Sequence, residues 1–164
     1  MIPSFLMDNP GLTPMAMALV AIVCVGVGYL LLHTRRQGHR ILWTLAALSL
    51  IPVAALTLLP TPGRSFVFCV YQFEMPTMRA VELLSNVALF FPVVFFTTLA
   101  TDKPLLTLTA GTALSESIEI IQGLIPAIGR SCDTNDWIMN TAGMITATLL
   151  ATATTRLTRR NIKQ

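Results

Sequence analysis

The amino-acid sequence predicts an all-α, polytopic membrane protein, built as one helical bundle of about five transmembrane helices. Hydrophobic residues make up 54% of the 164 residues, charged residues only 12%, and the mean hydropathy is +0.69. A soluble domain carries roughly 25% charged residues, so this composition excludes an ordinary soluble protein. A chain of this length has room for about five spans of roughly 20 residues each. Residues 1–164 are therefore expected to form a single membrane domain.

Five apolar segments are the expected transmembrane helices. Four of them contain no charged residue, and the remaining one carries Glu116 and Glu119. The residues near these acids, 105–113 and 118–125, are too apolar for a loop, so this segment is also expected to cross the membrane. The expected spans are residues 15–32, 41–59, 83–100, 104–128 and 137–155.

The distribution of lysine and arginine predicts the orientation. With the amino terminus outside, eight of the 11 cations face the cytoplasm, and only Arg64, Arg79 and Arg130 face outward. Cytoplasmic segments carry an excess of cations, so the amino terminus is expected outside and the carboxyl terminus in the cytoplasm. The first 14 residues lack the basic region of a cleaved signal peptide, so the first span is expected to be retained. The basic tail at residues 156–163 fits an anchor at lipid headgroups and not a nucleic-acid site.

This orientation puts two of the three cysteines outside the membrane. Cys24 falls within the first span, whereas Cys69 and Cys132 fall in the two outer loops, on the oxidising side. They could form a disulfide or remain free thiols, and their spacing matches neither a zinc ribbon nor a CxxC motif. The aromatic loop at residues 60–77 is expected to lie at the membrane surface, either as an interfacial belt or as a lid over the bundle.

The polar residues of the spans converge on the outer half of the membrane. The third span descends from outside, the fourth ascends and the fifth descends again, and each carries its polar residues near its outer end. A polar group inside a span costs several kcal/mol unless it is paired or hydrated, so these residues form a candidate binding site. They are Asn86, Glu116, Glu119, Gln122, Arg130, Asp133, Asp136 and Asn140.

Two stripes of small and polar residues indicate that the fourth and fifth spans pack together. At 100° per residue, each set falls on one helical face, and small residues allow helices to approach closely. Glu119 and Asn140 are expected at a similar depth. The stripes are Gly111, Ser115, Glu119 and Gln122 on the fourth span, and Asn140, Gly143, Ala147 and Ala151 on the fifth.

Arg130 is the expected partner of these acids. It could form charge-assisted hydrogen bonds with Glu119 or Asp133, or hold an anionic group such as a phosphate. The alternative is structural, with Arg130, Asp133, Glu119 and Asn140 only holding the last two spans together. Asp133, Asn135 and Asp136 could supply oxygen ligands to a divalent cation, although their spacing is not that of an EF-hand loop.

The same residues resemble a known family. Glu119-Ile-Ile-Gln122, followed by Arg130, Asp133, Asp136, Asn140 and Gly143, is similar to the signature of the VanZ-like family of bacterial membrane proteins. Asn86, Phe90 and Pro92 in the third span, and Thr57 to Pro60 at the end of the second, fit as well. The resemblance covers about residues 41–155. It departs at Val94 and Ala147, where the family usually has glycine.

The resemblance implies a multi-pass protein of the bacterial cell (inner) membrane. Members of the family are associated with lowered sensitivity to the glycopeptide teicoplanin, which acts on peptidoglycan precursors outside the cell membrane. The family has no settled biochemical activity, so the resemblance itself names no reaction and no cofactor.

Two functions of different classes remain open. The first is a binding protein for an envelope lipid or lipid-linked precursor, held by Arg130 with Asn86, Glu119, Gln122 and Asn140 shaping the pocket. The second is an intramembrane enzyme, a hydrolase or transferase acting on a lipid-linked phosphate or ester. In that case Glu119 or Asp136 would be the general base, with a metal on Asp133 and Asp136. His33 and His39 are expected at the inner surface, away from these acids.

Overall fold

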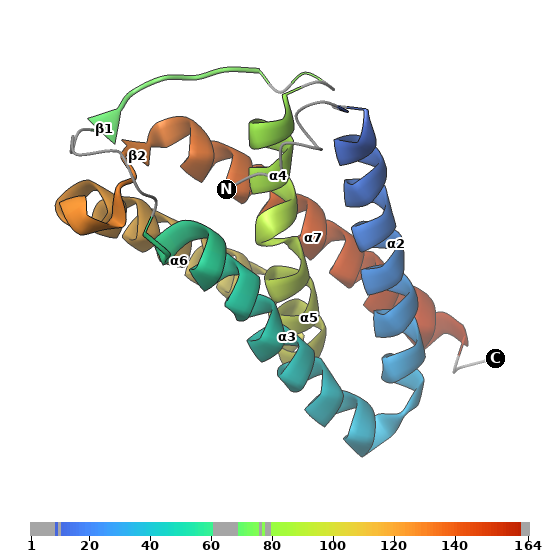
Figure 1. Cartoon of the computed structure of the whole chain (residues 1–164). Coiled ribbons are helices and arrows are strands. Elements are labelled where there is room, and N and C mark those ends of the chain that lie inside the picture. Colours follow the sequence, from blue (N-terminus) through green and yellow to red (C-terminus); the bar gives the residue numbers. More distant parts are fainter. Residues whose placement is uncertain (1–8, 10, 61–68, 76, 78–79, 162–164) are drawn as a thin grey trace.

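The computed structural model describes residues 9, 11–60, 69–75, 77 and 80–161, and within these the regular secondary structure is helical apart from one short strand pair (Figure 1). The expected all-α fold is confirmed. The helices are α2 (Leu12–His33), α3 (Arg35–Leu58), α4 (Val81–Leu89), α5 (Phe91–Thr101), α6 (Pro104–Leu124), the 3-10 helix η1 (Pro126–Ile128) and α7 (Thr134–Asn161). The strands are β1 (Cys69–Val70) and β2 (Cys132–Asp133).

The expected third span is a helix with one break. α4 ends at Leu89 and α5 begins at Phe91, with Phe90 between them. The break coincides with Pro92 in the first turn of α5, because proline lacks the N–H that would continue the helical hydrogen bonds and its ring crowds the preceding turn. At the other end of α5, Asp102 takes a left-handed conformation (φ 56°) that reverses the chain into α6.

The expected carboxyl end of the fourth span was wrong. α6 ends at Leu124, and residues 126–128 form a 3-10 turn in place of further α-helix. Pro126 is the physical reason, because a proline disfavours the helical conformation in the residue before it. Ile125 is extended accordingly (φ −113°, ψ 92°), and Gly129 then takes a left-handed conformation (φ 65°).

Three helical segments in the described part of the chain are long and apolar enough to cross a membrane. They are Leu12–His33, Gln37–Leu58 and Val81–Thr101, the last combining α4 and α5. The chain is therefore a multi-pass membrane protein. α6 and α7 are as long but more polar, and their crossing of the membrane stays a prediction, as does the orientation.

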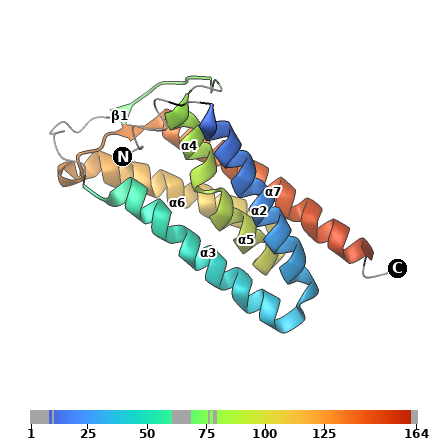
Figure 2. The same cartoon turned by 45° about the vertical axis from the view of Figure 1, so that its right-hand side comes forward.

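Consecutive long segments run in opposite directions, so the bundle has two distinct ends (Figures 1 and 2). At one end a disulfide joins Cys69, after α3, to Cys132, before α7. At the other end Asp102, between α5 and α6, forms an ion pair with Arg159 in the last turns of α7 (2.7 Å). We call these the disulfide end and the basic end. The basic end carries the described cations Arg40, Lys103, Arg156, Arg159 and Arg160.

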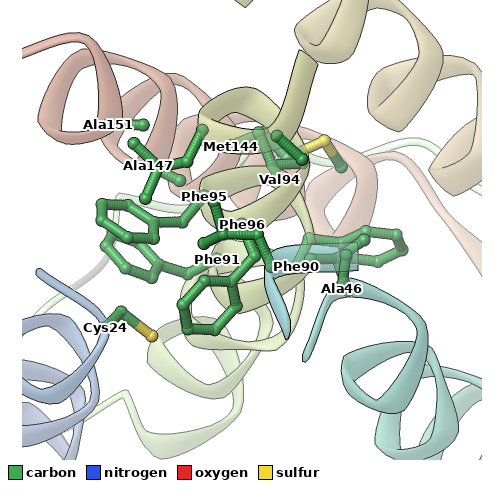
Figure 3. Close-up of a cluster of buried hydrophobic side chains, with 14 of the residues drawn as sticks. Cys24, Ala46, Phe90, Phe91, Val94, Phe95, Phe96, Met144, Ala147 and Ala151 are labelled. Carbon is green, nitrogen blue, oxygen red and sulfur yellow. The ribbon is translucent and has the colours of Figure 1, made fainter. Parts of the chain in front are cut away.

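The core lies where α5 crosses α7. Phe95, Met144 and Ala147 are fully buried there, and α2, α3, α4 and α6 surround them (Figure 3). Ring stacking of Phe91 on Phe95 (centroids 5.8 Å apart) and an edge contact of Phe95 with Phe96 (5.5 Å) fill the space beside α2. α5 is therefore the central helix, since it contacts α2, α3, α4, α6 and α7.

Two glycines set how closely the helices approach. A Cβ at Gly143 would overlap the backbone carbonyl of Val87, so α7 touches the backbone of α4 at this point. A Cβ at Gly111 would lie 2.8 Å from the Met144 sulfur and 3.0 Å from a methyl group of Val94. Gly143 of the predicted small stripe therefore packs against α4, while its neighbour Met144, outside the stripe, packs against Gly111 of α6.

Candidate functional site

A groove of about 380 Å³ opens at the disulfide end, between the last turns of α6, the start of α7 and the extended residues 69–75, which we call the strap. Most of its wall is apolar or aromatic. Three carboxylates interrupt that wall, those of Glu116, Glu119 and Asp133. The other lining residues are Cys69, Tyr71, Ile120, Gly123, Leu124, Cys132, Thr134 and Trp137.

The strap is fastened to the start of α7. β1 pairs in parallel with β2, with Cys69 opposite Cys132, and the disulfide joins these residues across a Cα separation of 4.6 Å. The backbone N–H of Gln72 donates to the Thr134 hydroxyl oxygen (3.0 Å), and the backbone N–H of Glu74 donates to the side-chain oxygen of Asn135 (3.1 Å). One wall of the groove is thus tied covalently and by hydrogen bonds to the helix that forms another.

Asp133 is the junction of the strap, α6 and α7. Its backbone N–H donates to Glu119 Oε2 (2.9 Å). Its carboxylate accepts from the backbone N–H of Asn135 (2.8 Å), which caps the first turn of α7, and from the Gln72 side-chain amide (2.8 Å). Glu119 and Asp133 therefore lie together, as expected, and both carboxylates accept hydrogen bonds within the protein.

Asp136 and Asn86 form a second polar contact beside the groove. The Asn86 amide donates to Asp136 Oδ1 (2.5 Å) and joins α4 to the first turn of α7. At 28 residues, α7 is longer than the roughly 20 residues that a bilayer requires, and Asp136 precedes the expected span 137–155. Burial, followed by the nearby carboxylates of Asp133 and Glu82, raises the pKa of Asp136 to about 6.

Gln122 and Asn140 lie inside the bundle and not in the groove. The Gln122 amide donates to the backbone carbonyl of Thr57 on α3 (2.8 Å). The Asn140 amide donates to the Ser115 hydroxyl (3.0 Å), so Asn140 is level with a residue one turn below Glu119. Both side chains are buried and hold helices together. Asn140 Oδ1 accepts no hydrogen bond from the described residues.

Arg130 lies outside the groove lining. Its side chain is half-buried, its Nε has no hydrogen-bond partner among the described residues, and no ion pair joins it to an acid within that part of the chain. Its charge lowers the pKa of Asp136, as the smallest of the effects on that carboxyl. Direct contact of Arg130 with Glu119 or Asp133, one of the two roles that the sequence led us to expect, is absent from the described part of the chain.

The eight predicted site residues thus fall into separate groups. Glu116, which is exposed, Glu119 and Asp133 line the groove, whereas the others lie beside or behind it. Sequence reasoning missed the two aromatic walls, Tyr71 and Trp137. The signal that could have found Tyr71 is the cysteine pair, since a bridge between Cys69 and Cys132 brings the residues after Cys69 to the start of α7.

The structure also gives the positions of the residues predicted for a metal site and of the two histidines. No group of three or more His, Cys, Asp or Glu side chains among the described residues is arranged to hold a metal ion. His33 hydrogen bonds to the Tyr29 carbonyl (2.8 Å) and His39 accepts from Trp43 (3.3 Å), both near the basic end. Neither imidazole is near Glu119 or Asp136.

A comparison with known protein families shows the family to which this chain belongs. The model of the VanZ/LLP1 family matches residues 16–156. The chain belongs to the VanZ/LLP1 family. The match begins in α2, earlier than the predicted resemblance, and includes both the α6 and α7 walls of the groove. No curated protein and no solved structure matches this VanZ-family chain.

Proposed function

We propose that this VanZ-family membrane protein binds an amphipathic component of the bacterial cell envelope, an envelope lipid or a lipid-linked precursor, in the groove at the disulfide end. The observation that carries the proposal is the juxtaposition of Glu119 and Asp133 with the exposed apolar side chains of Ile120 and Leu124 on one wall. A polar headgroup can bind at the carboxylates while an acyl or isoprenoid chain lies along the apolar side of α6.

The charges of the two ends support an outer-leaflet position. Cations gather at the basic end, which fits the cytoplasmic side. A disulfide persists in an oxidising compartment, which fits the outer side of the bacterial inner membrane. In this arrangement α6 and α7 both cross the bilayer, and the groove faces the leaflet where teicoplanin, with which VanZ-like proteins are associated, meets its peptidoglycan precursors.

The contacts of the acids favour binding over catalysis. The two carboxylates that could serve as a general base take part in different contacts, Glu119 with the backbone of Asp133 and Asp136 with the amide of Asn86. Each of these contacts joins two helices or a helix and a loop. The acids thus help to hold the walls of the groove in place.

Filling the groove tests the proposal. Ile120 is exposed and lines the groove, whereas its neighbour Ile121 is exposed but does not line it. We expect Ile120→Trp to lower the binding of phospholipids and of a lipid-linked peptidoglycan precursor, measured by native mass spectrometry of the purified protein, and Ile121→Trp to bind as the wild type does. Equal binding by both variants would refute a site in the groove. Conversion of the bound precursor to a product would establish the enzyme in place of the binding protein.

A further inference from the structure

We propose that the groove recognises a protonated primary amine, carried by the headgroup of its amphipathic ligand. This inference rests on the proposed function, because it specifies the chemistry of a ligand that the groove must first bind. The groove is the binding site, and its charge and hydrogen-bonding groups determine which headgroup chemistry it binds.

The charge of the lining is entirely negative. Glu116, Glu119 and Asp133 contribute carboxylates, and no lysine, arginine or histidine is among the described residues that line the groove. Arg130 is the only described cation at the disulfide end, and it does not line the groove. An anionic headgroup would meet like charge in a partly apolar setting, where electrostatic interactions are stronger than in water. A cationic headgroup meets complementary charge.

The hydrogen-bonding groups of the groove also favour a cationic headgroup. Three donors of the lining are already engaged: the backbone N–H of Asp133 on Glu119, the indole N–H of Trp137 on the carbonyl of Thr112 (3.4 Å), and the Thr134 hydroxyl on strap carbonyls. Among the described contacts, Glu119 Oε1 and both oxygens of Glu116 have no donor. The Tyr71 hydroxyl can donate or accept, whereas the free carboxylate oxygens only accept, so acceptors outnumber donors in the groove. An ammonium group supplies three donors to them.

The geometry brings these acceptors together beside aromatic rings. Glu116 and Glu119 are three residues apart on α6, so they lie on one face, about one turn from each other. Trp137 and Tyr71 line the same groove, and an aromatic face attracts a cation. Two carboxylates and aromatic walls bind an ammonium group by charge, by hydrogen bonds and by cation–π contact.

Acidic residues around the groove also favour a cationic ligand. Glu74, Glu82 and Asp136 also lie at the disulfide end, and the only described acid at the basic end is Asp102. The summed field of clustered charges raises the local concentration of ligands of opposite sign. The amine could belong to an aminophospholipid or to the peptide of a lipid-linked precursor, and both present the same ammonium chemistry to Glu116 and Glu119.

Paired probes that differ only in the amine test this inference. We would measure, by native mass spectrometry, the binding of phosphatidylethanolamine and its N-acetylated form, and of an amine-bearing lipid-linked peptide and its N-acetylated form. Loss of charge-assisted hydrogen bonds is expected to weaken binding at least about tenfold on acetylation. The pair that shows the larger preference identifies the source of the amine.

Matched variants assign the preference to the groove. Glu119→Gln keeps an oxygen that can accept from Asp133, and Glu116→Gln changes an exposed side chain, so both are expected to fold and to lose most of the preference for the free amine. Asp102→Asn removes one negative charge at the basic end, away from the groove and its surrounding acids, and should retain the preference. If the amine and acetylated probes bind equally well and Ile120→Trp abolishes the binding of both, amine recognition is refuted while binding in the groove is retained. If the probes bind Ile120→Trp with the same affinity as the wild type, both proposals are refuted.

Discussion

The Asn140 amide on α7 donates a hydrogen bond to the Ser115 hydroxyl on α6, 3.0 Å away in the buried interior of the bundle. The two residues are 25 positions apart and come from helices joined through the strand that carries Cys132. Their contact fixes the depth of α6 against α7 and so positions the two helical walls of the groove.

Breaking this contact is expected to destabilise the bundle modestly. Ser115→Ala leaves the buried amide without its acceptor, and hydrogen bonds between membrane helices contribute about 0.6 kcal/mol on average, up to roughly 1.7 kcal/mol. A double-mutant cycle with Asn140→Ala, followed by unfolding in mixed micelles, measures this coupling. Ser117→Ala is the control, since its exposed hydroxyl bonds only to Ala113 of its own helix. Additive effects of the two buried substitutions would contradict the prediction.

Removing the disulfide is expected to release the strap. A disulfide of this sequence separation, 63 residues, stabilises a fold by about 2–4 kcal/mol. We expect Cys69→Ser with Cys132→Ser to lower the melting temperature and to speed proteolysis near Tyr71. Reductant should reproduce the effect in the wild type and add nothing in the double variant. An unchanged melting temperature in both experiments would show that the hydrogen bonds to Thr134 and Asn135 suffice.

A methyl group at Gly143 is expected to force α7 away from α4. The added Cβ would overlap the Val87 carbonyl, and overpacking of this kind costs about 1–3 kcal/mol. Gly26→Ala is the matched control, because no atom lies within 4 Å of the position its Cβ would take, and alanine favours a helix by about 1 kcal/mol. The free energy of unfolding should fall for Gly143→Ala and stay equal or rise for Gly26→Ala.

Asp136 is expected to make stability depend on pH. Its pKa is raised to about 6 in the folded protein from an ordinary value near 3.8, so between these values the folded state binds more protons than the unfolded state. Stability should therefore fall as pH rises through this window. The groups that act on Asp136 are Asp133 and Glu82, which raise its pKa, and Asn86 and Arg130, which lower it.

The comparison of wild type with Asp136→Asn isolates this dependence. The free energy of unfolding of the wild type, measured at several pH values between 4 and about 7, should fall more steeply than that of the variant. Asp102→Asn, which changes an exposed acid at the basic end, should leave the slope unchanged. Parallel curves for the wild type and Asp136→Asn would contradict a raised pKa at this position.

Much of the fold could be predicted from the sequence because helix positions follow from local apolar runs. The expected spans coincide with α2, α3, the α4–α5 pair, α6 and α7, with ends that differ by up to six residues. The fourth helix ends before Pro126 and not at Ile128, because hydropathy alone does not register the helix-breaking effect of proline. The pairing of α6 with α7 was also predictable, since Ser115 and Asn140 each lie on a small stripe of their helix.

The site was less predictable because it depends on contacts across the chain. The sequence does not decide whether the disulfide forms, since two outer cysteines carry no information about the distance between them. The hydrogen bond between Gln72 and Thr134 joins residues 62 positions apart, and no local sequence pattern predicts such a contact. A direct contact of Arg130 with Glu119 or Asp133 is expected from their closeness along the chain, but the described residues form no such ion pair.

The crossing of α5 and α6 has room for one side chain and not for two. Val94 fills it from α5, and its methyl group would lie 3.0 Å from a Cβ at Gly111, which leaves α6 bare at that level. The Met144 sulfur of α7, 2.8 Å from the same Cβ position, closes this space from a second side. Gly111, Val94 and Met144 therefore form one steric unit across three helices, and a side chain at position 111 requires smaller residues at both of the other positions.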